Sequence, residues 1–140
     1  MMQLYLLSIL FLALGAAFLL SDTYGLSFAL LLSLRYAFRT SALFRRILIF
    51  SGLVLTLALA LWPVAPGPAL LGDLVPMINI GSLTIWYLYQ AIKGMGAGAQ
   101  EQASVLDATA LYVERNKRNV GFLTIIVAVV HFLAPWLVLV

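Results

Sequence analysis

The chain has 140 residues, of which 64% are hydrophobic and 9% are charged, and its formal net charge is +3. Soluble domains carry about a quarter charged residues, so this composition excludes an ordinary water-soluble fold and makes the bilayer the solvent. The chain contains no cysteine, which excludes disulfides, thiol chemistry and cysteine-ligated metal or iron–sulfur sites.

The apolar runs are continuous rather than alternating, as in LLSILFLALGAAFLL (residues 6–20), and this pattern predicts transmembrane α-helices. We predict a single all-α integral membrane domain over residues 1–140, a bundle of about five transmembrane helices. The predicted spans cover approximately residues 2–20, 23–44, 47–62, 70–92 and 120–140.

Polar or helix-breaking sequence separates these spans. The first span has no basic residue before it, which favours an uncleaved helix over a signal peptide, and a short turn at 21–25 follows it. Three prolines in WPVAPGP (62–68) end the third span and predict a stiff loop. The glycine-rich GMGAGA (94–99) predicts a hinge, and apolar residues at helical spacing within 100–119 predict a short cytoplasmic amphipathic helix.

The basic residues fix the predicted topology. All eight fall within Arg35–Arg46, at Lys93, or within Arg115–Arg118. Basic residues stay on the cytoplasmic side, so five spans require a cytoplasmic N-terminus and an outside C-terminus. This is the topology of a multi-pass protein in a bacterial inner membrane. An alternative with four spans, in which the second segment is a re-entrant hairpin, puts the first turn on the same side as the arginines.

Three polar side chains in the predicted spans form a candidate intramembrane site: Asp73, Asn79 and His131. Polar groups are costly at the bilayer centre, so each is a candidate functional residue. If the fourth and fifth spans are neighbours, Asn79 and His131 would meet beside Pro76, as in a small-ligand or proton site. The structural alternative makes Asp73 a helix cap and the other two hydrogen-bonding groups between helices.

The arginine cluster is a second candidate site, for an anion or a lipid headgroup, and comprises Arg35, Arg39, Arg45 and Arg46. An inner-loop anchor role explains Arg45 and Arg46. Arg35 is the deepest charge and needs a partner, for which we consider a headgroup, the carboxylate of Glu114 or another protein.

Enzyme signatures are poor: the chain has one histidine, no HExxH and no G-x-S-x-G motif. We therefore predict no catalytic residue, metal or cofactor, and haem ligation by His131 would require a second ligand. The basic residues are explained as membrane anchors, so nucleic acid is not an expected partner.

The function expected from the sequence is that of a non-enzymatic subunit of a larger membrane assembly, with a transporter complex as the leading expectation. Membrane lipids, other subunits or further copies of the chain are its expected partners. Small residues for close helix packing, Ala13 with Ala17 and Gly52 with Thr56, fit such association or packing within the chain. The alternatives are an autonomous oligomeric transporter or channel and a membrane enzyme acting on lipids.

Overall fold

The computed structural model describes residues 2–25, 29–61, 74–93 and 105–133 and confirms an all-α fold. The described residues form six helices: α1 (Met2–Tyr24), α2 (Ala29–Thr40), α3 (Ala42–Leu61), α4 (Leu74–Lys93), α5 (Val105–Arg115) and α6 (Lys117–Leu133). The predicted proline loop, the predicted GMGAGA hinge and Asp73 lie outside the described residues.

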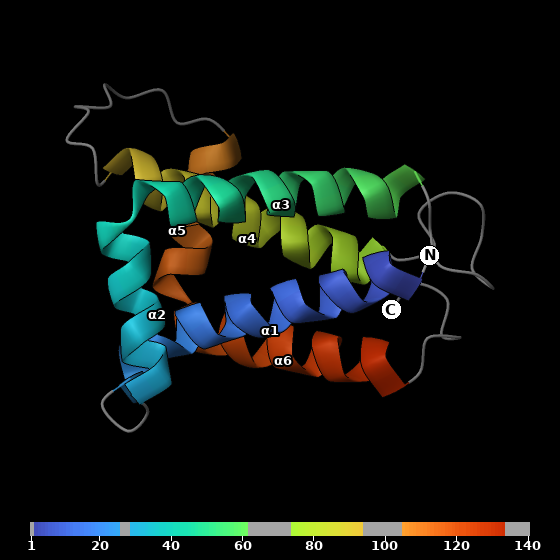
Figure 1. The fold of residues 1–140 in the computed structure, drawn as a ribbon, viewed down its shortest axis with the longest axis horizontal. Coiled ribbons are helices and arrows are strands. Elements are labelled where there is room, and N and C mark those ends of the chain that lie inside the picture. The colour runs from blue at the N-terminus through green and yellow to red at the C-terminus, as the bar shows by residue number, and fades with distance from the viewer. Residues whose placement is uncertain (1, 26–28, 62–73, 94–104, 134–140) are drawn as a thin grey trace.

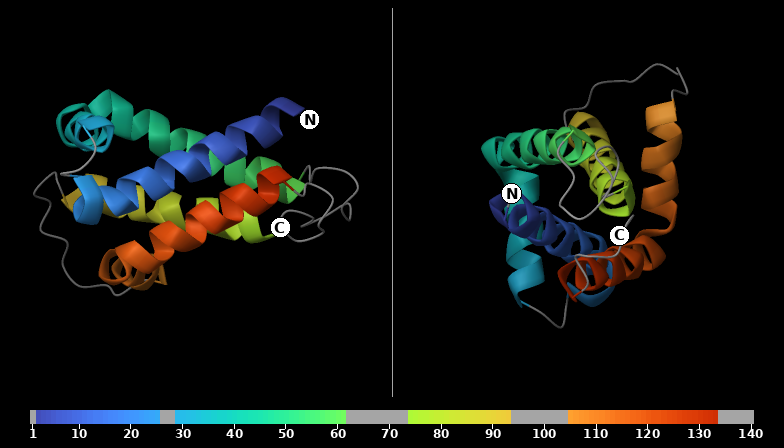
Figure 2. Two further views of the ribbon diagram at one scale, coloured as in Figure 1. Left: turned by 90° about the horizontal axis from the view of Figure 1, so that it is seen from below. Right: turned by 90° about the vertical axis from the view of Figure 1, so that its right-hand side faces the viewer.

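Four long helices form a bundle, and two short ones lie across one end of it (Figure 1). Helices α1, α3, α4 and α6 run along the long axis in alternating directions, and α2 and α5 cross the end where α1 and α4 finish. The closest pairings are α1 with α6 and α3 with α4 (Figure 2). The start of α1 and the end of α6 therefore meet at the opposite end of the bundle.

The structure does not support the five predicted spans. The predicted second span, 23–44, is wrong as one continuous helix, because α2 ends at Thr40 and α3 begins at Ala42 in a new direction. Twelve residues of α2 extend only about 18 Å, well short of the roughly 30 Å hydrocarbon core. Within the described residues, two helices are long and apolar enough to cross a membrane, Gln3–Ser21 and Ala42–Leu61. These two helices support membrane association.

Local hydrogen bonds explain why the chain turns between α2 and α3. The Ser41 hydroxyl accepts the backbone N–H of Phe44 at 3.2 Å, which is the bond of a helix N-cap. The guanidinium of Arg45 reaches back and donates to the carbonyl oxygens of Phe38, at 3.0 Å, and Arg39, at 2.8 Å. The end of one helix and the start of the next are both satisfied, so the break is specified by sequence.

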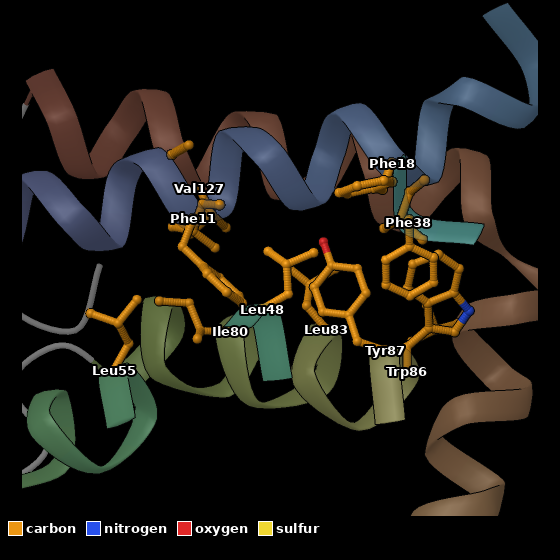
Figure 3. Packing of buried hydrophobic residues seen from close by; sticks show 14 of the residues in the cluster. Phe11, Phe18, Phe38, Leu48, Leu55, Ile80, Leu83, Trp86, Tyr87 and Val127 are labelled. Atoms are coloured by element: carbon orange, nitrogen blue, oxygen red, sulfur yellow. The ribbon is translucent and has the colours of Figure 1, made fainter. Parts of the chain in front are cut away.

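The core is apolar and, at the end near α2 and α5, mostly aromatic (Figure 3). The fully buried ring of Tyr87 is surrounded by Phe11, Phe18, Phe38 and Trp86, with ring centroids 5.3–6.1 Å apart. These rings come from α1, α2 and α4, so the cluster holds the crossing helix α2 against the bundle. The Tyr87 hydroxyl is buried and has no hydrogen-bond partner in the described part of the chain.

Small residues bring α3 and α4 together in a reciprocal pattern. Gly52 of α3 lies against Thr84 of α4, and Gly81 of α4 lies against Thr56 of α3. Each threonine hydroxyl donates to a carbonyl of its own helix, at Gly52 for Thr56 and at Ile80 for Thr84, so the interface needs no polar partner. The close packing expected at Gly52 and Thr56 is confirmed, and it lies within one chain.

The outer faces of the long helices are apolar and exposed. On α3 the large exposed side chains follow a continuous face: Leu43, Ile47, Phe50, Leu53, Val54, Leu57 and Leu61. Ala13 is also exposed and Ala17 is half-buried, and both line an outer groove between α1 and α6. Contiguous apolar surface of this extent is typical of a face covered by lipid or by another protein.

Candidate anion-binding site

The structure does not bring Asn79 and His131, two of the polar residues expected inside the membrane, together into one site. Asn79 is buried in α4 and accepts, at its amide oxygen, a hydrogen bond of 3.0 Å from the Thr124 hydroxyl of α6. His131 is also buried on α6, but seven residues after Thr124, which is about 10 Å along a helix. Asn79 and His131 therefore have separate surroundings.

His131 joins α6 to the first turns of α1. Its Nε2 lies 3.5 Å from the hydroxyl of Ser8, and its ring lies 4.9 Å from the ring of Tyr5. The Tyr5 hydroxyl donates to the carbonyl of His131 at 2.6 Å and lies 3.0 Å from that of Phe132. These contacts fix the register of α1 against α6, which is a structural role.

The arginines do form a site, at the end of the bundle that α2 and α5 cover. A cavity of about 380 Å³ opens there. Its lining comes from all six of the described helices and is mostly polar: Phe18, Ser21, Arg35, Phe38, Arg39, Arg45, Trp86, Gln90, Glu114 and Lys117. We call this cavity the basic pocket.

Three of the four arginines expected at an anion site line the basic pocket. Arg35 and Arg39 lie one turn apart on α2, so both extend from the same side of that helix. Arg45 enters from the first turn of α3, where its bonds to the end of α2 hold it in place. Arg46 lies outside the pocket and lines an apolar groove between α3 and α4.

Glu114 organises the opposite wall. One carboxylate oxygen accepts hydrogen bonds from Trp86 Nε1 at 2.8 Å and from Gln90 Nε2 at 2.5 Å. The other oxygen pairs with Lys117 Nζ at 2.8 Å, and that ammonium lies 5.8 Å from the centroid of the Trp86 ring. The carboxylate thereby ties α5 and α6 to α4.

The ionisation of Glu114 follows from these contacts. Partial burial raises the pKa of its carboxyl, but the hydrogen bonds from Lys117, Trp86 and Gln90, with the charge of Lys117, outweigh burial and hold that pKa below its ordinary value of 4.5. Glu114 is therefore a carboxylate at neutral pH, and its oxygens accept hydrogen bonds from the other residues of this wall of the pocket.

The charge balance of the basic pocket is positive. Four cationic side chains line it against one carboxylate, and that carboxylate is already paired with Lys117. Guanidinium groups present paired N–H donors that match the oxygens of phosphate or carboxylate. The described residues contain no cluster of three or more His, Asp or Glu that could hold a metal ion. The arrangement can bind an anion without a metal ion.

Sequence reasoning missed three residues of this wall, Trp86, Gln90 and Lys117. Glu114 was considered only as a partner for Arg35, whereas its ion pair is with Lys117. The available signal was the adjacency of Trp86 and Gln90, which are one turn apart at the basic end of a span. Polar and aromatic side chains at that position are typical of the interface between membrane and water.

The fold and the site define a class: an all-α bundle of four long helices, closed at one end by two short helices around a basic pocket. The chain belongs to a protein family of unknown function, whose sequence profile matches residues 1–131. Neither the curated proteins nor the solved structures contain a match.

Proposed function

We propose that this protein is a non-enzymatic, multi-pass membrane protein that binds a phosphate-bearing anion at the cytoplasmic end of its helix bundle. The observation that carries the proposal is the basic pocket, where three arginines and a lysine from three separate helices line one cavity of about 380 Å³. Bringing like charges together is unfavourable unless an anion offsets their repulsion. An occupant with several acceptor oxygens supplies that charge.

In this proposal α1, α3, α4 and α6 cross the membrane, and α2 and α5 lie at its cytoplasmic surface. Arg35, Arg39, Arg45, Arg115 and Arg118 all belong to elements at the end that α2 and α5 cover. The positive-inside rule makes that end cytoplasmic, in the bacterial inner membrane expected from the sequence. An even number of crossings then puts both termini outside, which replaces the cytoplasmic N-terminus expected with five spans.

The topology is testable because the chain has no cysteine of its own. A single cysteine introduced at Gln3 or at Arg118, both exposed, reports the side of each end of the bundle. We expect a membrane-impermeant maleimide added to intact cells to label the Gln3→Cys variant and to leave the Arg118→Cys variant unlabelled until the membrane is opened. Labelling of the Arg118→Cys variant in intact cells would overturn the proposed orientation.

Anion binding is tested most directly at Arg39, which is exposed and lines the basic pocket. We expect Arg39→Gln to weaken binding of glycerol 3-phosphate by about tenfold or more, because a hydrogen bond to a charged group contributes roughly 1.5–3 kcal/mol. Calorimetric titration of the purified protein in mild detergent measures this. Arg118→Gln, an exposed arginine outside the pocket, is the matched control and should bind like the wild type. Equal affinities for all three proteins, or no binding by the wild type, would contradict the proposal.

The role expected from the sequence, a subunit of a larger membrane assembly such as a transporter complex, is a second candidate. It is favoured by α3, whose most hydrophobic stretch is only 28% buried inside the bundle. The remaining face is available to lipid or to partner helices. Purification in mild detergent with mass spectrometry of the bound proteins tests this role, and a chain that purifies alone as a monomer would exclude it.

A further inference from the structure

The groove between α3 and α4 carries a second combination of charge and apolar surface. It has a volume of about 370 Å³, and its apolar lining includes Ile49, Phe50 and Leu53 of α3 and Leu88 and Ile92 of α4. Arg45 and Arg46 line the same groove, and both belong to the first turns of α3. The groove is therefore apolar along its length and basic at one end.

We propose that this groove binds an anionic phospholipid, with one acyl chain along the apolar lining and the phosphate on Arg45 and Arg46. This inference rests on the proposed function and specifies the source of its anion as a lipid headgroup. The occupant follows from charge complementarity: in an anionic phospholipid an apolar chain is joined to a phosphate, and these two parts match the apolar and the basic lining of the groove.

The position of the groove fits the inner leaflet. Seven residues separate Arg46 from Leu53, so the apolar lining extends about 10 Å from the basic end, about a third of the hydrocarbon core. Phe50 and Leu53 are 70% and 50% exposed, so the surface is open to a chain from the side. Anionic lipids are attracted to cytoplasmic clusters of lysine and arginine, with about 1 kcal/mol for each basic residue near the surface.

Arg45 connects the groove with the basic pocket, because its side chain lines both. A phosphate on Arg45 lies at the boundary between the two, so the polar headgroup beyond it can enter the basic pocket. Arg46 is exposed and has no ion pair with an acid of the described residues. Its charge is available to the lipid.

Two pairs of variants test the proposal, with one member of each pair as a control. Arg46→Gln removes one of the two charges at the groove, and Arg118→Gln removes the charge of another exposed arginine, which lies outside the groove. Leu53→Ser makes the apolar lining polar, and Leu57→Ser makes the same change one turn further along the exposed face of α3, outside the lining. All four side chains are exposed, so each substitution should leave the bundle folded. Thermal melting of each variant checks this.

The measurement is native mass spectrometry of the purified protein in mild detergent, titrated with phosphatidylglycerol or with phosphatidylcholine. We expect phosphatidylglycerol to bind more tightly than phosphatidylcholine. Arg46→Gln and Leu53→Ser should each weaken phosphatidylglycerol binding about fivefold, and the two controls should bind like the wild type.

Equal binding by Leu53→Ser and Leu57→Ser, or no preference for the anionic lipid, would overturn the groove inference. If glycerol 3-phosphate still binds the wild type in that case, the basic pocket takes a soluble phosphate and the proposed function stands. If neither lipid nor glycerol 3-phosphate binds, both the inference and the proposed function fail.

Discussion

Replacing Gly52 with alanine is expected to lower the free energy of unfolding by about 2 kcal/mol, because the added methyl has no space. It would overlap the Thr84 hydroxyl and lie 3.2 Å from Thr84 Cβ, so rotation of that side chain does not clear it. It would also lie 2.7 Å from Phe11 Cζ, the end of a buried ring. The side chains of Thr84 and Phe11, or the helices that carry them, would have to shift to accommodate one carbon atom.

Gly81→Ala is the matched control across the same interface. A methyl at Gly81 would lie 3.5 Å from Thr56 Cγ2, which is an ordinary van der Waals contact. Alanine is favoured over glycine in a helix by up to roughly 1 kcal/mol, so Gly81→Ala should be neutral or stabilising. Denaturant unfolding in detergent, followed by helical circular dichroism, compares the variants. If Gly52→Ala proves as stable as Gly81→Ala, the close packing of α3 on α4 described above is incorrect.

The side chain of Tyr87 makes two opposite contributions to stability, because its buried ring is stabilising and its buried hydroxyl is destabilising. Two variants should show these contributions separately. Tyr87→Ala removes a ring that is fully buried among Phe11, Phe18, Phe38 and Trp86, so we expect a loss of about 3–5 kcal/mol. Tyr87→Phe keeps the ring and removes a buried hydroxyl that has no partner in the described part of the chain, so it should stabilise the protein by about 1 kcal/mol.

The same unfolding measurement in detergent distinguishes these two contributions. Tyr87→Phe also controls for disturbance of the aromatic cluster, because its shape is nearly that of the native residue. If Tyr87→Phe clearly lowers the free energy of unfolding, the hydroxyl has a favourable hydrogen-bond partner, and its description as unpartnered is incorrect.

The sequence was sufficient to predict an all-α fold and a helical bundle. It did not reveal the turn between α2 and α3, because hydropathy reports burial in lipid and carries no information on direction. The turn depends on Ser41 as a cap and on Arg45 reaching back to Phe38 and Arg39. Arg45 was interpreted only as a topological anchor, and no role was expected for Ser41.

Only part of the basic pocket could be predicted from the sequence, because one of its walls depends on contacts between residues that are distant in the chain. Arg35, Arg39 and Arg45 are close in sequence and could be grouped by inspection. The wall that faces them joins Glu114 to Trp86 and Gln90, which are 28 and 24 residues away in sequence. Only the folded arrangement of α4 and α5 brings them together, and no spacing rule connects residues on two different helices.

The pairing of α1 with α6 also has a consequence for the order of assembly during synthesis. Tyr5 meets the carbonyl of His131, a partner 126 residues later in the chain, and Ser8 meets the ring of the same residue. Of the described helices, α1 is therefore made first and its closest neighbour, α6, is made last. In the proposed membrane topology, the face of α1 that carries Tyr5 and Ser8 is covered by lipid or by the insertion machinery until α6 has been made, so the bundle closes only after α6 is inserted.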